Sequence, residues 1–66
     1  MNIVTNKYDI EIEYDVAVQL MDDDLREYLH GELAPCSCQE FFKMYAIVHK
    51  AVYGKVWELD QPNPTY

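Results

Sequence analysis

The chain has 66 residues, which is enough for one domain with one hydrophobic core. Charges interrupt every apolar run before the roughly 20 residues that a membrane span needs, so we expect no membrane segment. The net charge of −7 repels nucleic acid and membrane surfaces, and direct binding of either is not expected. The first six residues lack the basic flank and apolar run of a signal peptide. With the two cysteines interpreted as reduced thiols, this predicts a cytoplasmic protein.

The excess of negative charge lies in the first half of the chain. Residues 1–33 hold nine acidic side chains against one lysine and one arginine, whereas residues 34–66 hold three acids and three lysines. A surface with this charge attracts basic protein surfaces. We therefore expect the partner to be a protein that has a basic surface.

Residues 8–14 alternate between large apolar and acidic side chains, and this period of two predicts a strand with one buried face. The acids of this strand would project from its other face about 6.7 Å apart. Together with acids of the following segment they would form an anionic strip that competes for the basic groove of a nucleic-acid-binding protein. The alternative is that these acids only keep the strand soluble or protect its edge. The residues of the predicted strip are Asp9, Glu11, Glu13, Asp22, Asp23 and Glu27.

A first helix is predicted directly after this strand. Asp15 is a suitable N-cap, and the spacing of the apolar residues predicts a helix over residues 15–30. Gly31 would end it in a left-handed conformation, and Pro35 would discourage its continuation.

A second helix is predicted over residues 37–53. Ser37 and Glu40 have the spacing of a capping box at its start, and Gly54 would end it. This helix is apolar nearly all round, so it must be covered on more than one side. We expect a homodimer or larger homo-oligomer to supply the additional cover. The predicted interface residues are Met44, Ile47, Val48 and Ala51.

These elements predict a mainly α fold with one domain over residues 1–59 and an extended tail over 60–66. The helices would form an antiparallel hairpin beside the strand at 8–14. A shorter strand at 55–59 would pair with the first strand or across a dimer. The expected core residues are Ile10, Ile12, Leu20, Met21, Leu25, Tyr28, Phe42, Tyr45, Val52 and Trp57.

Two polar residues fall within the predicted apolar faces. Asp24 lies on that of the first helix and His49 on that of the second. A lone buried charge is costly, so we predict a buried hydrogen-bonded pair between these two side chains. A general-base role for the pair is the weaker reading, because no nucleophile accompanies it.

The two cysteines allow a metal-binding interpretation. Cys36 and Cys38 have ligand types that suit zinc, and His30 and His49 are the histidines of the chain. Structural zinc sites usually have wider cysteine spacing and a matching second pair, so reduced thiols are the preferred interpretation. A zinc- or redox-responsive regulator stays open as an alternative function.

No residue pattern favours catalysis. The two glycines stand at predicted helix ends and form no phosphate-binding loop, and Ser37 is explained by its cap. We therefore expect neither an enzyme nor a cofactor.

A resemblance adds to these patterns. It is carried by Leu33-Ala34-Pro35-Cys36-Ser37, Gln39-Glu40-Phe41-Phe42, His49, Gly54 and Trp57-Glu58-Leu59-Asp60. About half of the chain resembles the short, uncharacterised acidic proteins of bacterial phages and mobile elements. The resemblance implies a counter-defence protein of the anti-CRISPR or anti-restriction type, and it implies no particular fold, ligand or catalytic residue.

The leading hypothesis is therefore an acidic protein-binding inhibitor that occludes a basic, nucleic-acid-binding surface. The first rival is a structural or interaction module that assembles through the apolar second helix. In that case the acids would only confer solubility.

Overall fold

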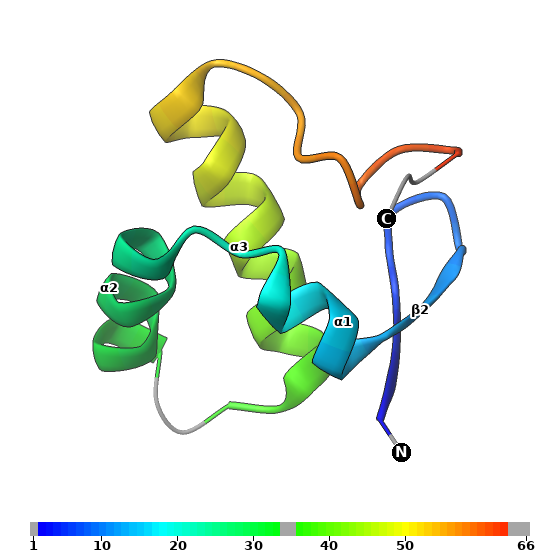
Figure 1. Ribbon diagram of the computed structural model, residues 1–66, viewed down its shortest axis with the longest axis horizontal. Coiled ribbons are helices and arrows are strands. Elements are labelled where there is room, and N and C mark those ends of the chain that lie inside the picture. Colours follow the sequence, from blue (N-terminus) through cyan, green and yellow to red (C-terminus); the bar gives the residue numbers. More distant parts are fainter. Residues whose placement is uncertain (1, 34–35, 64–66) are drawn as a thin grey trace.

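The computed structural model describes residues 2–33 and 36–63, and a long helix lies at its centre (Figure 1). The elements in chain order are β1 (Ile3–Thr5), β2 (Glu11–Glu13), α1 (Tyr14–Gln19), α2 (Asp23–Leu33) and α3 (Cys38–Tyr53). The central helix α3 contacts α1, α2 and β1, while α1 also contacts β2. The predicted fold class, mainly α with a short N-terminal strand, is confirmed, and that strand pairs with a second one, β1, that was not predicted.

The sheet is an antiparallel hairpin of β1 and β2, in which Val4 pairs with Ile12. The predicted strand at 8–14 is shorter, because its first residues form the hairpin turn. Asn6 organises that turn, since its Oδ1 accepts hydrogen bonds from the backbone amides of Tyr8 (2.9 Å) and Ile10 (3.1 Å). Alternation of apolar and acidic residues therefore gave the correct buried position, Ile12, although it overestimated the length of the strand.

The helix predicted over 15–30 is two helices, because the chain breaks at 20–22. Asp22 causes the break: its carboxylate accepts a hydrogen bond from the amide of Leu25 (3.1 Å) and so caps a new helix. Its own amide donates to the hydroxyl of Tyr45 at 2.7 Å instead of to a helical carbonyl. The predicted cap at Asp15 is also wrong, since α1 begins at Tyr14 and Asp15 lies in its first turn.

The ends of the other helices follow partly from local sequence. Gly31 does not end α2, which continues to Leu33, a residue packed against the core. The predicted start of α3 is confirmed, because the Ser37 hydroxyl accepts a hydrogen bond from the Glu40 amide at 3.2 Å. Its predicted end is confirmed as well, since Gly54 has φ 74°. Pro35, and residues 64–66 of the predicted tail, lie outside the described residues.

The predicted strand at 55–59 is wrong. Trp57 and Leu59 are buried and Glu58 is exposed, but this segment makes a turn in which the Asp60 amide donates to the Trp57 carbonyl (2.9 Å). The Asn6 side chain holds the segment against the hairpin by donating to the carbonyl of Leu59 (2.8 Å). The segment is thus held by this side-chain amide and by the burial of Trp57 and Leu59 in the core, and not by a strand ladder.

The core lies where α3 meets the other elements. Six of the ten expected core residues are buried: Ile12, Met21, Leu25, Phe42, Tyr45 and Trp57. Ile10 and Leu20 are partly buried against that core. The predictions for Tyr28 and Val52 are wrong, because these side chains are 60% and 59% exposed. Both predictions assumed wider apolar faces than these helices bury.

Candidate functional site

The hairpin presents carboxylates to solvent because its sheet has one buried face. On β2 the Ile12 side chain is 1% exposed, whereas Glu11 and Glu13 beside it are exposed. Side chains alternate between the faces of a strand, so both carboxylates leave the sheet on the same side. Asp9 lies exposed in the turn before β2, with φ 63°. We refer to Asp9, Glu11 and Glu13 as the hairpin acids.

A second set of carboxylates lies at the start of α2. Asp22 is exposed although its carboxylate caps the helix. Asp23 pairs with Arg26 at 3.3 Å, which partly neutralises this surface, and Glu27 is exposed in the next turn. We refer to Asp22, Asp23 and Glu27 as the α2 acids.

The structure separates these two sets. The helix α2 packs against α3, whereas the hairpin packs against α1 and α3. Figure 1 shows α2 and β2 on opposite sides of the molecule. The single anionic strip expected from the sequence is therefore corrected to two acidic surfaces. The break at 20–22 is the reason, because it allows α2 to fold away from the line of α1 and the hairpin.

The predicted buried pair of Asp24 and His49 does not form. Asp24 is exposed, and the half-buried His49 ring has its Nδ1 3.3 Å from the backbone oxygen of Lys55. The prediction assumed one continuous helix with position 24 on its apolar face. After the break, α2 instead buries Leu25 and Leu29.

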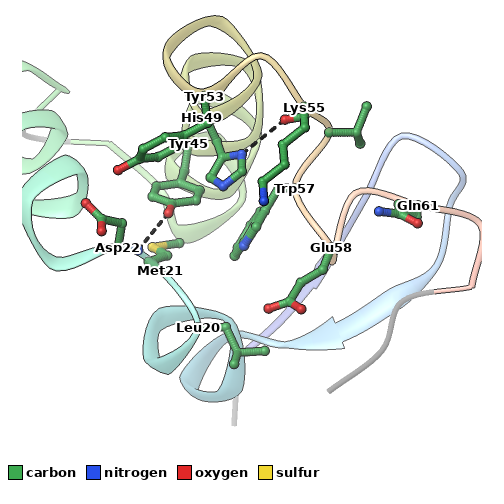
Figure 2. Close-up of a pocket in the computed structure, with 11 residues that line it drawn as sticks. Leu20, Met21, Asp22, Tyr45, His49, Tyr53, Lys55, Trp57, Glu58 and Gln61 are labelled. Atoms are coloured by element: carbon green, nitrogen blue, oxygen red, sulfur yellow. Dashed lines mark hydrogen bonds between the residues drawn. The ribbon is translucent and has the colours of Figure 1, made fainter.

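A groove of about 600 Å³ lies between the C-terminal half of α3 and the α1–α2 junction, and the sequence did not reveal it (Figure 2). One wall comes from α3, where Tyr45, His49 and Tyr53 are spaced four residues apart and share a face. Trp57, from the turn after α3, packs on Tyr45 with ring centroids 4.5 Å apart. The spacing on α3 was visible in the sequence, but the return of Trp57 to that face was not.

Charged groups border these rings. Asp22 and Glu58 contribute carboxylates to the groove, and Lys55 contributes an ammonium group. Burial raises the pKa of Tyr45, and the charges of Asp22 and Glu58 raise it further, against the opposing effect of its hydrogen bond to the Asp22 backbone. The nearby Asp22 carboxylate is the main cause of the raised pKa of Tyr53, because it favours the protonated phenol. Both phenols therefore keep their protons to higher pH than free tyrosine.

The predicted oligomer interface on α3 is only partly free. Ile47 is 62% exposed and Ala51 is exposed, whereas Met44 and Val48 are half-buried. Val48 also packs against the core of its own chain. Val52, expected in the core, extends the exposed apolar surface of this helix.

The cysteines are free thiols, Cys36 exposed and Cys38 half-buried. Within residues 2–33 and 36–63, no group of three or more His, Cys, Asp or Glu side chains is arranged to hold a metal ion. None of the helices in that same part of the chain has the length and apolar character needed to cross a membrane.

Comparison with known proteins gives a family. Residues 8–57 match the family described as Anti-CRISPR protein AcrIC5. The matched segment covers most of the chain and extends from the hairpin turn to Trp57, so it includes both acidic surfaces and the rings of the groove. No curated protein and no solved structure matches the chain.

Proposed function

The chain belongs to the anti-CRISPR protein AcrIC5 family, and on that premise we propose that it inhibits a CRISPR–Cas component by covering a basic, nucleic-acid-binding surface with its own carboxylates. Anti-CRISPR proteins are inhibitors, and their partners are CRISPR–Cas components. The mode of inhibition is argued below from the surface of this chain. Binding alone accounts for it, with no catalytic step.

The observation that carries the proposal is the exposed acidic face of the hairpin. Glu11 and Glu13 project from the same side of a strand whose other face is held in the core by Ile12. A strand is an extended backbone, so its carboxylates form a regular row about 6.7 Å apart. Hydrogen bonds of the Asn6 side chain fix the turn that carries Asp9. The backbone that carries the negative row is therefore held in place before binding, which lowers the entropy cost of association.

The chemistry of CRISPR–Cas effectors supports a basic surface as the target. RNA-guided effectors hold their nucleic acid in a positively charged channel. Affinity for nucleic acid in such channels comes largely from phosphate contacts and counterion release. A protein of net charge −7 that places its carboxylates on those lysines and arginines would release the same counterions and exclude the nucleic acid.

Neutralising the hairpin acids tests the proposal. We expect Glu11→Gln with Glu13→Gln to weaken binding to the inhibited CRISPR–Cas effector about tenfold, since two charge contacts across a desolvated interface are lost. Binding is measured by biolayer interferometry at low and high salt, and displacement of target DNA by gel shift. The wild-type affinity should fall steeply with salt, and the double variant should have a smaller salt dependence.

The matched control neutralises two acids elsewhere. Glu32→Gln with Glu40→Gln gives the same net charge, and both residues are exposed on other parts of the surface. This pair should bind almost as well as the wild type. Equal loss in the two pairs would mean that only total charge matters, and no loss in the hairpin pair would refute the proposed mode.

The exposed apolar face of α3 supports a second candidate, an interaction module that assembles through this helix. Ile47 and Val52 are 62% and 59% exposed. In that case Ile47→Asp would abolish self-association in sedimentation experiments while leaving the hairpin acids in place. The leading proposal instead predicts that Ile47→Asp leaves inhibition intact.

A further inference from the structure

The groove between α3 and the α1–α2 junction has walls of two kinds, and together they suit one type of side chain. Its accessible ring is Tyr53, which is 46% exposed, while Tyr45 and Trp57 are buried and form the floor. Figure 2 shows Asp22 and Glu58 on either side of that floor. Aromatic faces and carboxylates both attract cations.

We propose that this groove receives an arginine side chain of the protein partner. The inference rests on the proposed function in so far as the partner surface is basic, but it uses a different face of the molecule from the hairpin acids. A guanidinium is planar, so it can stack on the Tyr53 ring while its edge donates to the Asp22 carboxylate. The Glu58 carboxylate attracts the same charge from the other side of the floor.

Lys55 supports a cationic occupant. It borders the groove, and in the view of Figure 2 its side chain extends from the rim toward the rings of His49 and Trp57. The groove thus already holds one cation of the protein itself beside its aromatic floor. An arginine from the partner would compete with Lys55 for this position, and removal of the Lys55 ammonium group should strengthen binding.

The charges argue against the other chemical classes. An anionic ligand would meet two carboxylates and a single ammonium group. A purely apolar ligand would desolvate the Asp22 carboxylate, whose hydrogen-bond partner is the Leu25 amide, and would bury the Glu58 carboxylate, which is costly. A lysine would satisfy the charge but lacks the flat, delocalised group that stacks on a ring and pairs with a carboxylate at once.

Trp57 is the only tryptophan of the chain and lines the groove, so its fluorescence and its indole N–H signal in NMR come from a single residue at this site. The probe is a blocked Gly-Arg-Gly peptide, titrated into the whole protein. Peptides with lysine or with citrulline, the neutral analogue of arginine, serve as controls. We expect a saturable shift of the Trp57 signals with the arginine peptide, with a dissociation constant on the order of millimolar. The shift should be weaker with lysine and absent with citrulline.

Two matched pairs of variants test the position of the site. Glu58→Gln should weaken the arginine peptide about threefold, whereas Glu32→Gln, which changes the net charge equally on α2, should not. Lys55→Ala should tighten binding about threefold, and Lys50→Ala, an exposed lysine outside the groove, should change it much less. All four side chains are exposed, and far-UV circular dichroism checks that the variants fold.

The proposal is overturned if arginine and citrulline peptides shift Trp57 alike, if neither does, or if Glu58→Gln behaves as Glu32→Gln. If the titration fails but inhibition depends on Glu11 and Glu13, only the groove proposal is removed. If the groove binds arginine but inhibition does not depend on the hairpin acids, only the proposed hairpin mode is removed.

Discussion

Replacing Asn6 with alanine should remove a large part of the free energy of unfolding of this small protein, because the Asn6 side chain joins three segments of the chain. Asn6 is 5% exposed. Its Nδ2 donates to the carbonyls of Leu59 (2.8 Å) and Gln61 (3.0 Å), and its Oδ1 accepts from the amides of Tyr8 (2.9 Å) and Ile10 (3.1 Å). The amide therefore uses both hydrogens and both lone pairs.

The expected loss follows from these four hydrogen bonds. A typical bond contributes about 1 kcal/mol net, and a buried group left without a partner costs about 1–3 kcal/mol. The bond to the Leu59 carbonyl is buried, while the other three are partly buried, so water can replace part of what is lost. We therefore expect Asn6→Ala to reduce the free energy of unfolding by about 2–4 kcal/mol. A chain of this length has about 3–10 kcal/mol in total.

Urea denaturation, followed by far-UV circular dichroism and by Trp57 fluorescence, measures this loss. Trp57 should become more exposed in the variant even before unfolding, because the segment after α3 loses its hold on the hairpin. Asn63→Ala, at an exposed asparagine, is the control and should change stability by less than about 0.5 kcal/mol. A loss below that value for Asn6→Ala would refute the reasoning that this amide clamps the fold.

Three further perturbations test other parts of the structure. Gly54→Ala should lower the free energy of unfolding by about 1 kcal/mol in thermal melts, because φ is 74° there and the open space around the site leaves backbone strain as the only cost. An unchanged stability would contradict this. Gln39→Ala should lower the free energy of unfolding by about 1–2 kcal/mol, since the Gln39 side chain accepts from the Thr5 backbone N–H and donates to the Thr5 carbonyl, at 2.8 Å each. Gln39→Glu keeps only the acceptor and should recover part of that stability. Alkaline pH should destabilise the protein, because burial raises the pKa of Tyr45 above the 10.0 of a free tyrosine. Above that pH the unfolded chain loses the Tyr45 proton first, so the free energy of unfolding falls. A melting temperature that stays constant between pH 8 and 11 would exclude this.

The parts of the fold that local chemistry determines were predictable from the sequence. The helix α3 begins at the Ser37 cap and ends at Gly54 because a hydroxyl acceptor and a residue free to adopt positive φ act within one turn. The alternation of apolar and acidic residues identified the buried Ile12 and the outward direction of Glu11 and Glu13, because successive side chains of a strand point to opposite faces. Each of these features depends on neighbours in the chain.

Features that depend on partners distant in the chain were not predictable. Asn6 reads as an ordinary turn residue, and its hydrogen bonds to Leu59 and Gln61 join positions more than fifty residues apart. The break in the predicted first helix depends on the Tyr45 hydroxyl, which accepts the Asp22 amide from the facing helix. Tertiary contacts of this kind override the apolar spacing that predicted one continuous helix.

The groove exists because of two departures from regular structure. A continuous helix over 15–30 would have kept Asp22 in a helical turn, and a strand at 55–59 would have laid Trp57 along a sheet. Instead, the break presents Asp22 beside Tyr45, and the turn after Gly54 brings Trp57 back onto α3. Functional sites are expected where a chain departs from its local preferences and compensates elsewhere. At the break, the Tyr45 hydroxyl and the Leu25 amide supply that compensation, and in the segment after α3 the hydrogen bonds of Asn6 supply it. The stability of the protein and the position of Trp57 in the groove should therefore change together when Asn6 is replaced.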